Sequence, residues 1–322
     1  MEERTLHIGS VGTSAVMETM QEAMRLTPGI ACEVVYSRDA SRARDYANKV
    51  GVPKSCSDLE TLFSMPELDV IYLASPNSLH PSQTIAALEH GKHVFVEKPA
   101  ATSEKDVCAM RDAARANGVF FFEAITTIFM PNLLECKKLL PRLGAIRGAE
   151  IKYGQYSSRY EAFLRGEKPS VFDPAMQGGA LNDLGIYCIH TALELFGKPK
   201  SVRCEAEYAS NGVDIADTLY LEYPGFCCKL EASKVKDIGS GCHIEGENGR
   251  VEQEGPMNAF DELHVELDGN GMDFMQNGAN RMIYELARFR DAILAHDEVF
   301  FARMVQKSAD AAWILEQARQ GR

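Results

Sequence analysis

Short apolar runs alternate with longer amphipathic segments over the first 123 residues of the chain. The short runs are rich in β-branched and aromatic residues and predict strands at 5–11, 32–37, 69–74, 93–97 and 119–124. The longer segments have apolar residues at helical spacing and predict helices at 15–26, 40–49, 80–90 and 103–117. Strands and helices that alternate in this way form a parallel sheet covered on both faces. We therefore expect an α/β domain with a doubly wound Rossmann sheet over residues 1–123, with ligands at the carboxyl ends of its strands.

A different pattern begins near residue 124 and predicts a second domain over residues 124–322. One long helix is expected at 178–196, and two more close the chain at 279–295 and 302–319. Residues 217–233 alternate between polar and apolar on both sides of Pro224-Gly225, which predicts a hairpin with a type II turn. The second domain is thus predicted to be α+β on an antiparallel or mixed sheet. Its other strands are expected at 146–156, 200–209, 241–246, 249–254 and 262–267.

The overall composition is that of a globular protein, since 45% of the 322 residues are hydrophobic and 25% are charged. A net charge of −12 argues against general binding to nucleic acid or anionic membranes, because both depend on clustered lysine and arginine. No apolar run reaches the length of a membrane helix, and the start MEERTLHIG has no apolar signal core. The nine cysteines are scattered without a C-x-x-C pair, as expected for free thiols. We therefore expect a cytoplasmic protein.

The turn after the first predicted strand is similar to a dinucleotide-binding turn but departs from it at two positions. In the G-x-G-x-x-G pattern Gly12 is the first glycine, whereas Ser14 and Met17 replace the second and third small residues. A left-handed backbone at Ser14 would cost about 1–2 kcal/mol. Its hydroxyl can nevertheless donate to a phosphate, and the helix start still presents N–H groups. Met17 predicts a wider helix-to-strand spacing, and we expect Gly12, Thr13, Ser14 and Ala15 to bind the cofactor.

The end of the second predicted strand bears on which dinucleotide is bound. NAD-preferring sites have a carboxylate there that holds the ribose 2′-hydroxyl. Here Ser37 and Arg38 come first, a hydroxyl and a planar cation that both suit the 2′-phosphate of NADP. Asp39 follows and is equally suited to cap the next helix, while an exposed loop arginine is the alternative interpretation of Arg38. The sequence therefore allows NADP or NAD and favours NADP.

Polar residues also follow the predicted strands 69–74 and 93–97, at the sheet edge where ligands bind. Pro99 restricts the residue before it to an extended backbone and so fixes the direction in which Lys98 leaves the sheet. A lysine at a strand end is usually a solvated charge, but beside a nicotinamide ring it would serve proton transfer. The candidate binding residues at this edge are Ser75, Asn77, His80, Glu97 and Lys98.

Several segments carry a resemblance to a known enzyme family. YLASPNSLHPSQTIAALEHGKHVFVEKP, residues 72–99, holds an E-K-P motif after a PNxxH turn, and GGALNDLGIYCIH, residues 178–190, and HIEGENGRVE, residues 243–252, extend the likeness. The chain resembles the glucose-fructose oxidoreductase, inositol dehydrogenase and rhizopine-catabolism (Gfo/Idh/MocA) family. FFEAITTIFMP, residues 121–131, together with residues 178–190 looks most like its dihydrodiol dehydrogenase branch. The resemblance implies an NAD(P)-dependent oxidoreductase with a Rossmann domain and a C-terminal open-sheet domain. Members are often paired through that sheet, so a homodimer or homotetramer is expected.

The resemblance also implies roles for particular residues. The lysine of the E-K-P motif, Lys98, is placed at the nicotinamide and the substrate hydroxyl. Asp183 and His190 match the family's helix motif, and Tyr187 matches a tyrosine of the dihydrodiol dehydrogenase branch. Independently of the family, these three residues have the spacing i, i+4 and i+7, which places them on one stripe of an otherwise apolar helix. The alternative is that Glu194 extends the stripe and the whole row faces water.

These features predict hydride transfer between C4 of a nicotinamide and a carbon that bears a secondary hydroxyl, in a sugar, polyol or cyclic diol. Lys98 or His190 would take the hydroxyl proton, and the sequence does not decide between them. Lys98 would then stabilise the developing oxyanion. Asp183 would orient the substrate or His190, and Tyr187 would hydrogen-bond a neighbouring hydroxyl.

Two other functions are compatible with the same features. Ser14 and Met17 motivate a sensor that binds a dinucleotide or sugar without turnover. A lyase or glycosidase that uses tightly held NAD as a transient oxidant is the other alternative. No metal site is expected, because Cys242-His243 lacks partners at metal-ligand spacing.

Overall fold

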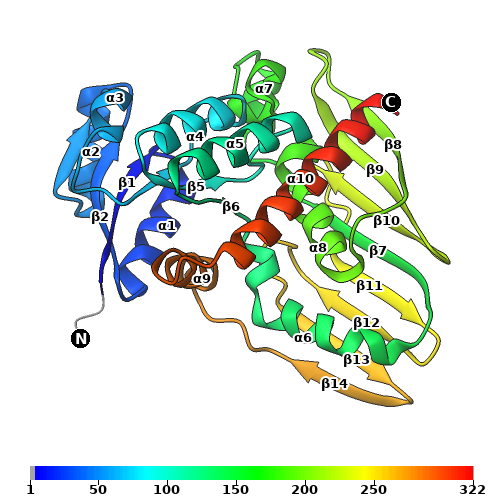
Figure 1. The fold of residues 1–322 in the computed structure, drawn as a ribbon. Helices are drawn as coiled ribbons and strands as arrows, with labels where there is room; N and C mark the ends of the chain where they lie inside the picture. Colours follow the sequence, from blue (N-terminus) through cyan, green and yellow to red (C-terminus); the bar gives the residue numbers. More distant parts are fainter. Residues whose placement is uncertain (1–3, 322) are drawn as a thin grey trace. The chain divides into compact units, whose positions relative to one another are not determined.

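The protein's structure, a computed structural model, describes residues 4–321 and divides the chain into two compact units (Figure 1). Unit 1 consists of the residues up to Ala101, Lys105–Ala124 and Asn280–Ala309. Unit 2 consists of Thr102–Glu104, Ile125–Ala279 and the residues from Asp310 on. The units are more interleaved than the continuous segments 1–123 and 124–322 that the sequence predicts.

Unit 1 is built on a parallel sheet of six strands in the order β3-β2-β1-β4-β5-β6, which confirms the predicted doubly wound sheet (Figure 1). The chain order reverses between β1 and β4, so the topological switch point lies at the carboxyl ends of these two strands. The short elements β3 and α3 were not predicted, because three and five residues are too few to show a period. The strands are β1 (Leu6–Val11), β2 (Ile30–Tyr36), β3 (Lys54–Cys56), β4 (Val70–Leu73), β5 (His93–Glu97) and β6 (Phe121–Ala124). The helices are α1 (Ala15–Leu26), α2 (Ala40–Val50), α3 (Leu59–Phe63), α4 (His80–Glu89), α5 (Glu104–Asn117) and α9 (Met282–Leu294), with the 3-10 turn η1 (Asn77–Leu79).

Two C-terminal elements pack on the sheet of unit 1: helix α9 and the first half of α10 (Glu298–Gln320). Phe289 of α9 stacks on Phe122 of β6, with ring centroids 4.6 Å apart, and meets Phe95 of β5 edge-on at 4.4 Å. Phe301 of α10 stacks on Phe120 with the centroids 4.8 Å apart. The burial of these rings explains why a segment distant in sequence packs on the parallel sheet of unit 1.

Unit 2 is built on an eight-stranded sheet in the order β14-β13-β12-β11-β7-β10-β9-β8 (Figure 1). Only the β7–β10 pair is parallel among the strand pairs described, so the predicted mainly antiparallel sheet is confirmed. Gly225 in the β9–β10 turn has φ +92°, which a type II turn needs at its third position. The strands are β7 (Ile146–Gly154), β8 (Ser201–Tyr208), β9 (Asp214–Tyr223), β10 (Phe226–Ser233), β11 (Ser240–Gly246), β12 (Gly249–Glu254), β13 (Glu262–Leu267) and β14 (Asn270–Phe274).

One face of this sheet is apolar and the other is charged. Helix α8 packs on β7 and β10, whose inward residues include Ile151 and Leu230, both buried. On the opposite face Lys229 forms ion pairs with Glu150 and Glu231. The helical segments of unit 2 are α6 (Pro131–Leu139), α7 (Tyr160–Leu164), α8 (Ile186–Phe196), the π-helical turn η6 (Leu181–Gly185) and the 3-10 turns η2 (Thr126–Phe129), η3 (Leu140–Leu143), η4 (Ser170–Phe172) and η5 (Pro174–Met176).

Over residues 4–321, none of the helices combines the length and the apolar character that crossing a membrane requires.

Candidate active site

Gly12 forms the bend that follows β1, and no other residue type fits there. Its φ is +122°, a conformation that L side chains rarely adopt, and a Cβ at this position would lie 2.7 Å from the carbonyl oxygen of Ala74. Its backbone N–H donates to the carbonyl of Tyr36 at 3.2 Å. The turn therefore passes close to both neighbouring strands at the topological switch point.

Ser14 occupies the second position of the pattern without strain. It is the N-cap of α1 with φ −84° and ψ 171°, an extended conformation that a residue with a side chain adopts without strain. Its hydroxyl makes no capping hydrogen bond to the helix, and both Ser14 and Ala15 are exposed. Met17, at the third position, is fully buried. The first turn of α1 is thus open to an anion.

The carboxylate of Asp39, after β2, is occupied by the helix that it caps. It accepts from the backbone N–H of Arg42 at 2.9 Å and from the hydroxyl of Ser41 at 2.5 Å. These hydrogen bonds, that of Ser41 first, hold the pKa of Asp39 below its usual range. Asp39 is therefore the N-cap of α2. Ser37 is half-buried beside it, and Arg38 is exposed.

Arg42 was missed in the sequence, although it lies one helical turn after Arg38. Its Nε donates to Oγ1 of Thr13 at 2.8 Å, so a guanidinium from α2 reaches the turn after β1. The spacing of the two arginines, i and i+4 at a helix start, is a signal that a search for anion sites could have used.

His80 joins the turn after β4 to the E-K-P segment. The side chain is fully buried, with Nδ1 2.8 Å from the carbonyl oxygen of Pro99 and Nε2 2.8 Å from that of Ser75. Two carbonyl acceptors favour the doubly protonated ring, but burial has the larger effect and lowers the pKa of His80. The half-buried Asn77 lies in the turn that this imidazole holds.

Glu97 and Lys98 end β5 beside the fully buried Tyr72 of β4. The Tyr72 hydroxyl donates to Oε1 of Glu97. Burial raises the pKa of Glu97, whereas the hydrogen bond from Tyr72 and the charge of Lys98 lower it. Lys98 is half-buried, and its peptide bond to Pro99 is cis.

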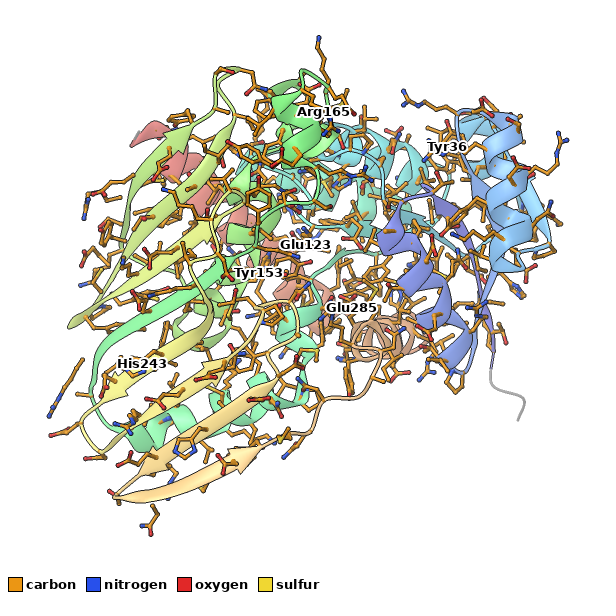
Figure 2. The ribbon with its side chains drawn as sticks, turned by 180° about the vertical axis from the view of Figure 1, so that it is seen from behind. Tyr36, Glu123, Tyr153, Arg165, His243 and Glu285 are labelled. Atoms are coloured by element: carbon orange, nitrogen blue, oxygen red, sulfur yellow. The ribbon has the colours of Figure 1, made fainter. Side chains whose placement is uncertain are left out.

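Glu123 of β6 is a second buried carboxylate of unit 1, and the sequence did not single it out (Figure 2). It is 2% exposed, accepts from the backbone N–H of Ala100 at 3.0 Å and accepts from the hydroxyl of Ser308 at 2.6 Å. It thereby ties the residues after Lys98 to β6 and α10. A lone acidic residue in the apolar strand FFEA was the available signal.

These residues of unit 1 fit a bound dinucleotide. A Cβ at Gly12 would fill the cradle next to Ala74, and the first turn of α1 has no side-chain cap. Thr13, Ser14, Arg38 and Arg42 supply the hydroxyl and guanidinium donors that phosphate groups need. Lys98, Ser75 and Asn77 lie at the carboxyl ends of β5 and β4, the same edge of the sheet.

The glycine-rich start of GGALNDLGIYCIH is held by an aspartate of β9. A Cβ on Gly179 would lie 2.4 Å from Oδ1 of Asp214, and the other carboxylate oxygen, Oδ2, accepts from the backbone N–H of Leu181 at 2.8 Å. A Cβ on Gly185 would lie 3.0 Å from Cδ1 of Leu181 and at an ordinary contact distance of 3.5 Å from Cβ of Ala232 in β10, so the helix packs directly on β10 here. The result is the π-helical turn η6, followed by α8.

Asp183 lies in this π-helical turn and forms an ion pair with Lys234, the residue after β10. Tyr187, one turn later, is half-buried and meets Tyr153 of β7 edge-on, with ring centroids 5.8 Å apart. His190 is 1% exposed. The row is therefore not a water-facing stripe, and the candidate residues form two groups, one in each unit.

Two other expectations concern residues of unit 2. Glu194 does not extend a water-facing stripe: its side chain is 8% exposed and pairs with Lys137 at 2.5 Å. Cys242 is buried, and His243 is paired with Glu245 at 3.0 Å. In the described part of the chain no three His, Cys, Asp or Glu residues are arranged to hold a metal ion.

Comparison with known proteins gives consistent matches along the chain. Residues 6–124 match an oxidoreductase family with an NAD-binding Rossmann fold, and residues 136–252 match the GFO/IDH/MocA C-terminal domain. The chain is 35% identical over 318 residues to the scyllo-inositol 2-dehydrogenase (NADP(+)) IolU of Bacillus subtilis (strain 168), which covers 96% of this chain and 95% of that protein.

More distant relatives extend the comparison. The trans-1,2-dihydrobenzene-1,2-diol dehydrogenase of Macaca fuscata fuscata is 29% identical over 299 residues, covering 87% of this chain and 84% of that protein. The solved structure of a levoglucosan dehydrogenase in complex with NADH and levoglucosan has a TM-score of 0.88 at 20% identity, and the match covers 99% and 97% of the two chains. At that identity the structural likeness supports the fold alone.

Proposed function

The chain belongs to the Gfo/Idh/MocA family of oxidoreductases, and from this premise we propose that it oxidises a secondary hydroxyl of a cyclic polyol or diol with NADP. As a member of this family it is an NAD(P)-dependent oxidoreductase that acts on CH–OH groups. The observation that carries the proposal is the gathering of the Gly12 turn, the two arginines after β2 and Lys98 at one edge of the parallel sheet. The relatives named for inositol and dihydrodiol substrates support a cyclic substrate.

NADP is proposed rather than NAD because Asp39 caps α2 and the guanidinium of Arg42 reaches the turn after β1. The Asp39 carboxylate is taken up by Arg42 N–H and Ser41, so it is not directed to a ribose hydroxyl. Ser37, Arg38 and Arg42 then leave a hydroxyl and two guanidinium groups for a 2′-phosphate. Arg42→Ala is expected to raise KM for NADP about tenfold or more and to leave KM for NAD within about twofold. Equal losses for both cofactors would contradict the preference.

In the proposed reaction the bound nicotinamide supplies a hydride acceptor at C4. Thr13, Ser14 and the start of α1 bind the pyrophosphate, and His80 acts indirectly by holding the turn that carries Asn77. Lys98 accepts the proton of the substrate hydroxyl at Nζ and then stabilises the oxyanion. Asp183 orients the substrate, and the Tyr187 hydroxyl hydrogen-bonds a neighbouring hydroxyl.

We propose Lys98 as the base because it directly follows β5, at the sheet edge where the Gly12 turn and the arginines after β2 also lie. A base must come within hydrogen-bond reach of the hydroxyl proton, and Lys98 lies at the same edge as the residues proposed to bind the cofactor. His190 lies in α8 of unit 2, and we give it a positioning role for Asp183 and Tyr187 on the same helical stretch.

The test is turnover followed by the absorbance of the reduced nicotinamide, with NADP or NAD and a panel of inositols, cyclic diols and aldoses. Lys98→Met is expected to lower kcat by about 100-fold or more, the loss typical of a missing proton-transfer group. Lys105→Met, on the exposed side of α5, is the matched control and should keep kcat within about twofold of wild type. A Lys98→Met enzyme with near-normal kcat would contradict the role of Lys98.

The same assay separates the alternative functions. Binding of NADP without turnover on any substrate of the panel would favour a dinucleotide or sugar sensor. A cofactor that co-purifies, with substrate consumed and no net reduced nicotinamide, would favour a lyase or glycosidase.

We also propose a cytoplasmic homodimer or homotetramer that pairs through the sheet of unit 2. The charged face of that sheet supports this, since Lys152, Lys229, Glu150 and Glu231 are ion-paired within the chain and can meet a second copy without isolated charges. Light scattering measures the oligomeric state directly.

A further inference from the structure

Lys234 is a buried cation that the proposed reaction has not yet used. It directly follows β10, and its side chain is only 3% exposed. Lysine is rarely buried to this extent without a specific partner. Its ammonium donates to Oδ2 of Asp183, the candidate residue of the π-helical turn.

The backbone around Lys234 is fixed from both sides. Its N–H donates to the carbonyl of Ile215 at 2.9 Å, and its carbonyl accepts from the N–H of Ser157 at 2.8 Å. The ring of Phe172 lies 5.3 Å from Nζ and borders the ammonium on an apolar side. The position of the ammonium is therefore determined by the fold rather than by a flexible loop.

The ammonium has more donors than the ion pair uses. A lysine carries three N–H donors, and one of them is directed to Asp183. Among residues 4–321, Asp183 is the hydrogen-bond acceptor of the Lys234 Nζ. In an ion pair the partners keep their charges, so a carboxylate acceptor and ammonium donors are presented side by side. Adjacent hydroxyl groups, each of which can donate and accept, match such a pair.

We propose that Lys234 and Asp183 together recognise a vicinal diol of the substrate in unit 2. The Asp183 carboxylate accepts from one hydroxyl, and the Lys234 ammonium donates to the oxygen of the hydroxyl next to the reacting carbon. This inference rests on the proposed oxidation of a cyclic polyol or diol and adds a substrate requirement: two neighbouring hydroxyl groups. Lys234 is then a specificity-determining residue, because a mono-alcohol leaves its donors without a partner.

The test compares trans-cyclohexane-1,2-diol with cyclohexanol on the same enzyme preparation. The ratio of kcat/KM for the two substrates is independent of how much protein is folded, since both are measured on the same sample. Lys234→Gln is expected to lower this ratio about tenfold or more, the effect of one lost hydrogen bond to a charged group. Lys234→Arg, which keeps the charge and the donors, should restore much of the ratio.

Lys236→Met is the matched control. Lys236 is two residues further on, its side chain is 60% exposed, and it pairs with Glu207. It should leave the ratio within about twofold of wild type, as an exposed ion pair has little effect. A ratio that stays unchanged in folded Lys234→Gln would overturn the proposal and leave Lys234 as a structural partner of Asp183.

A binding experiment distinguishes failure of this proposal from failure of the proposed function. If the wild type oxidises neither substrate, calorimetric titration with scyllo-inositol still measures the site. About tenfold weaker binding to Lys234→Gln than to wild type would then support diol recognition without catalysis. Equal binding, or no binding to the wild type, would overturn it.

Discussion

Gly12 and Ser14 are two residues apart in the first turn of unit 1, yet their backbone conformations differ. Gly12 has φ +122° and no room for a Cβ, whereas Ser14 has an ordinary extended conformation. A second glycine is therefore not required for the turn to form here. What the missing glycine changes is the surface offered to the phosphates, which now includes a hydroxyl.

This difference predicts opposite outcomes for two small substitutions. Ser14→Gly should change the dissociation constant of NADP by less than about fivefold, because it removes at most one neutral hydrogen bond. Gly12→Ala should weaken NADP binding about 100-fold or unfold the turn, since its Cβ would lie 2.7 Å from the Ala74 oxygen. Fluorescence titration with NADPH measures both constants. Loss of binding in Ser14→Gly would show that the hydroxyl is an essential ligand.

Glu123 is expected to act on Lys98 through the segment between them. Glu123→Ala removes the acceptor of the Ala100 N–H and should lower the free energy of unfolding by about 1–3 kcal/mol. It should lower kcat as well, because Ala100 is two residues from Lys98. Ser308→Ala removes the other hydrogen bond and leaves Ala100 held, so its effect on kcat should be smaller. Urea unfolding and steady-state kinetics test the pair; equal kcat losses would contradict the positioning role.

At the scale of elements, a histidine with a lowered pKa connects β5 to the residue before β6. Nδ1 of His93 accepts the backbone N–H of Phe120 at 3.0 Å, and burial lowers the pKa of His93 to about 4. The unfolded chain therefore binds a proton between pH 6.5 and about 4 that the folded protein does not bind. Stability from this group is present above pH 6.5 and is lost as the pH falls through the folded pKa.

His93→Asn keeps an acceptor for Phe120 and removes the titration. Relative to wild type, the variant should become more stable as the pH falls below 6.5, by at most about 1.4 kcal/mol per pH unit. Urea unfolding of both proteins between pH 7 and 5 measures this difference. A difference that does not depend on pH would contradict the assigned pKa.

The hydrophobic period predicted most elements but not how they join. Alternation and turn chemistry predicted the type II turn at Pro224-Gly225 and the strands of both sheets except β3 and β14. The helix expected at 178–196 is instead a π-helical turn followed by α8, since the bond from Leu181 N–H to Asp214 and the approach to Ala232 are tertiary contacts. Lys234 and Glu123 were missed for a related reason: a single charge beside an apolar strand has the same appearance whether it is solvated or buried.

Helix α9 should matter to the Rossmann sheet as much as its own strands do. Phe289→Ala removes a ring packed on Phe122 and Phe95 and is expected to cost about 3–5 kcal/mol of stability. Val299→Ala is the control, because that side chain is 82% exposed and the change should stay within about 0.5 kcal/mol. Urea denaturation reports both values. A cost near that of the control would show that α9 contributes little to unit 1.

At the scale of the whole molecule, unit 1 consists of segments that are distant in sequence. Cofactor binding can therefore test whether these segments unfold as one cooperative unit. A ligand that binds the native state only, at 100 times its dissociation constant, stabilises it by about 2.7 kcal/mol. If unit 1 is one cooperative body, NADPH should slow amide exchange in residues 6–101 and 105–124 and equally in α9, although α9 is far away in sequence. The Lys98→Met protein should show the same protection, which separates binding from turnover. Protection confined to residues 6–124, with α9 unchanged, would show that the aromatic contacts of Phe289 do not couple the helix to the sheet.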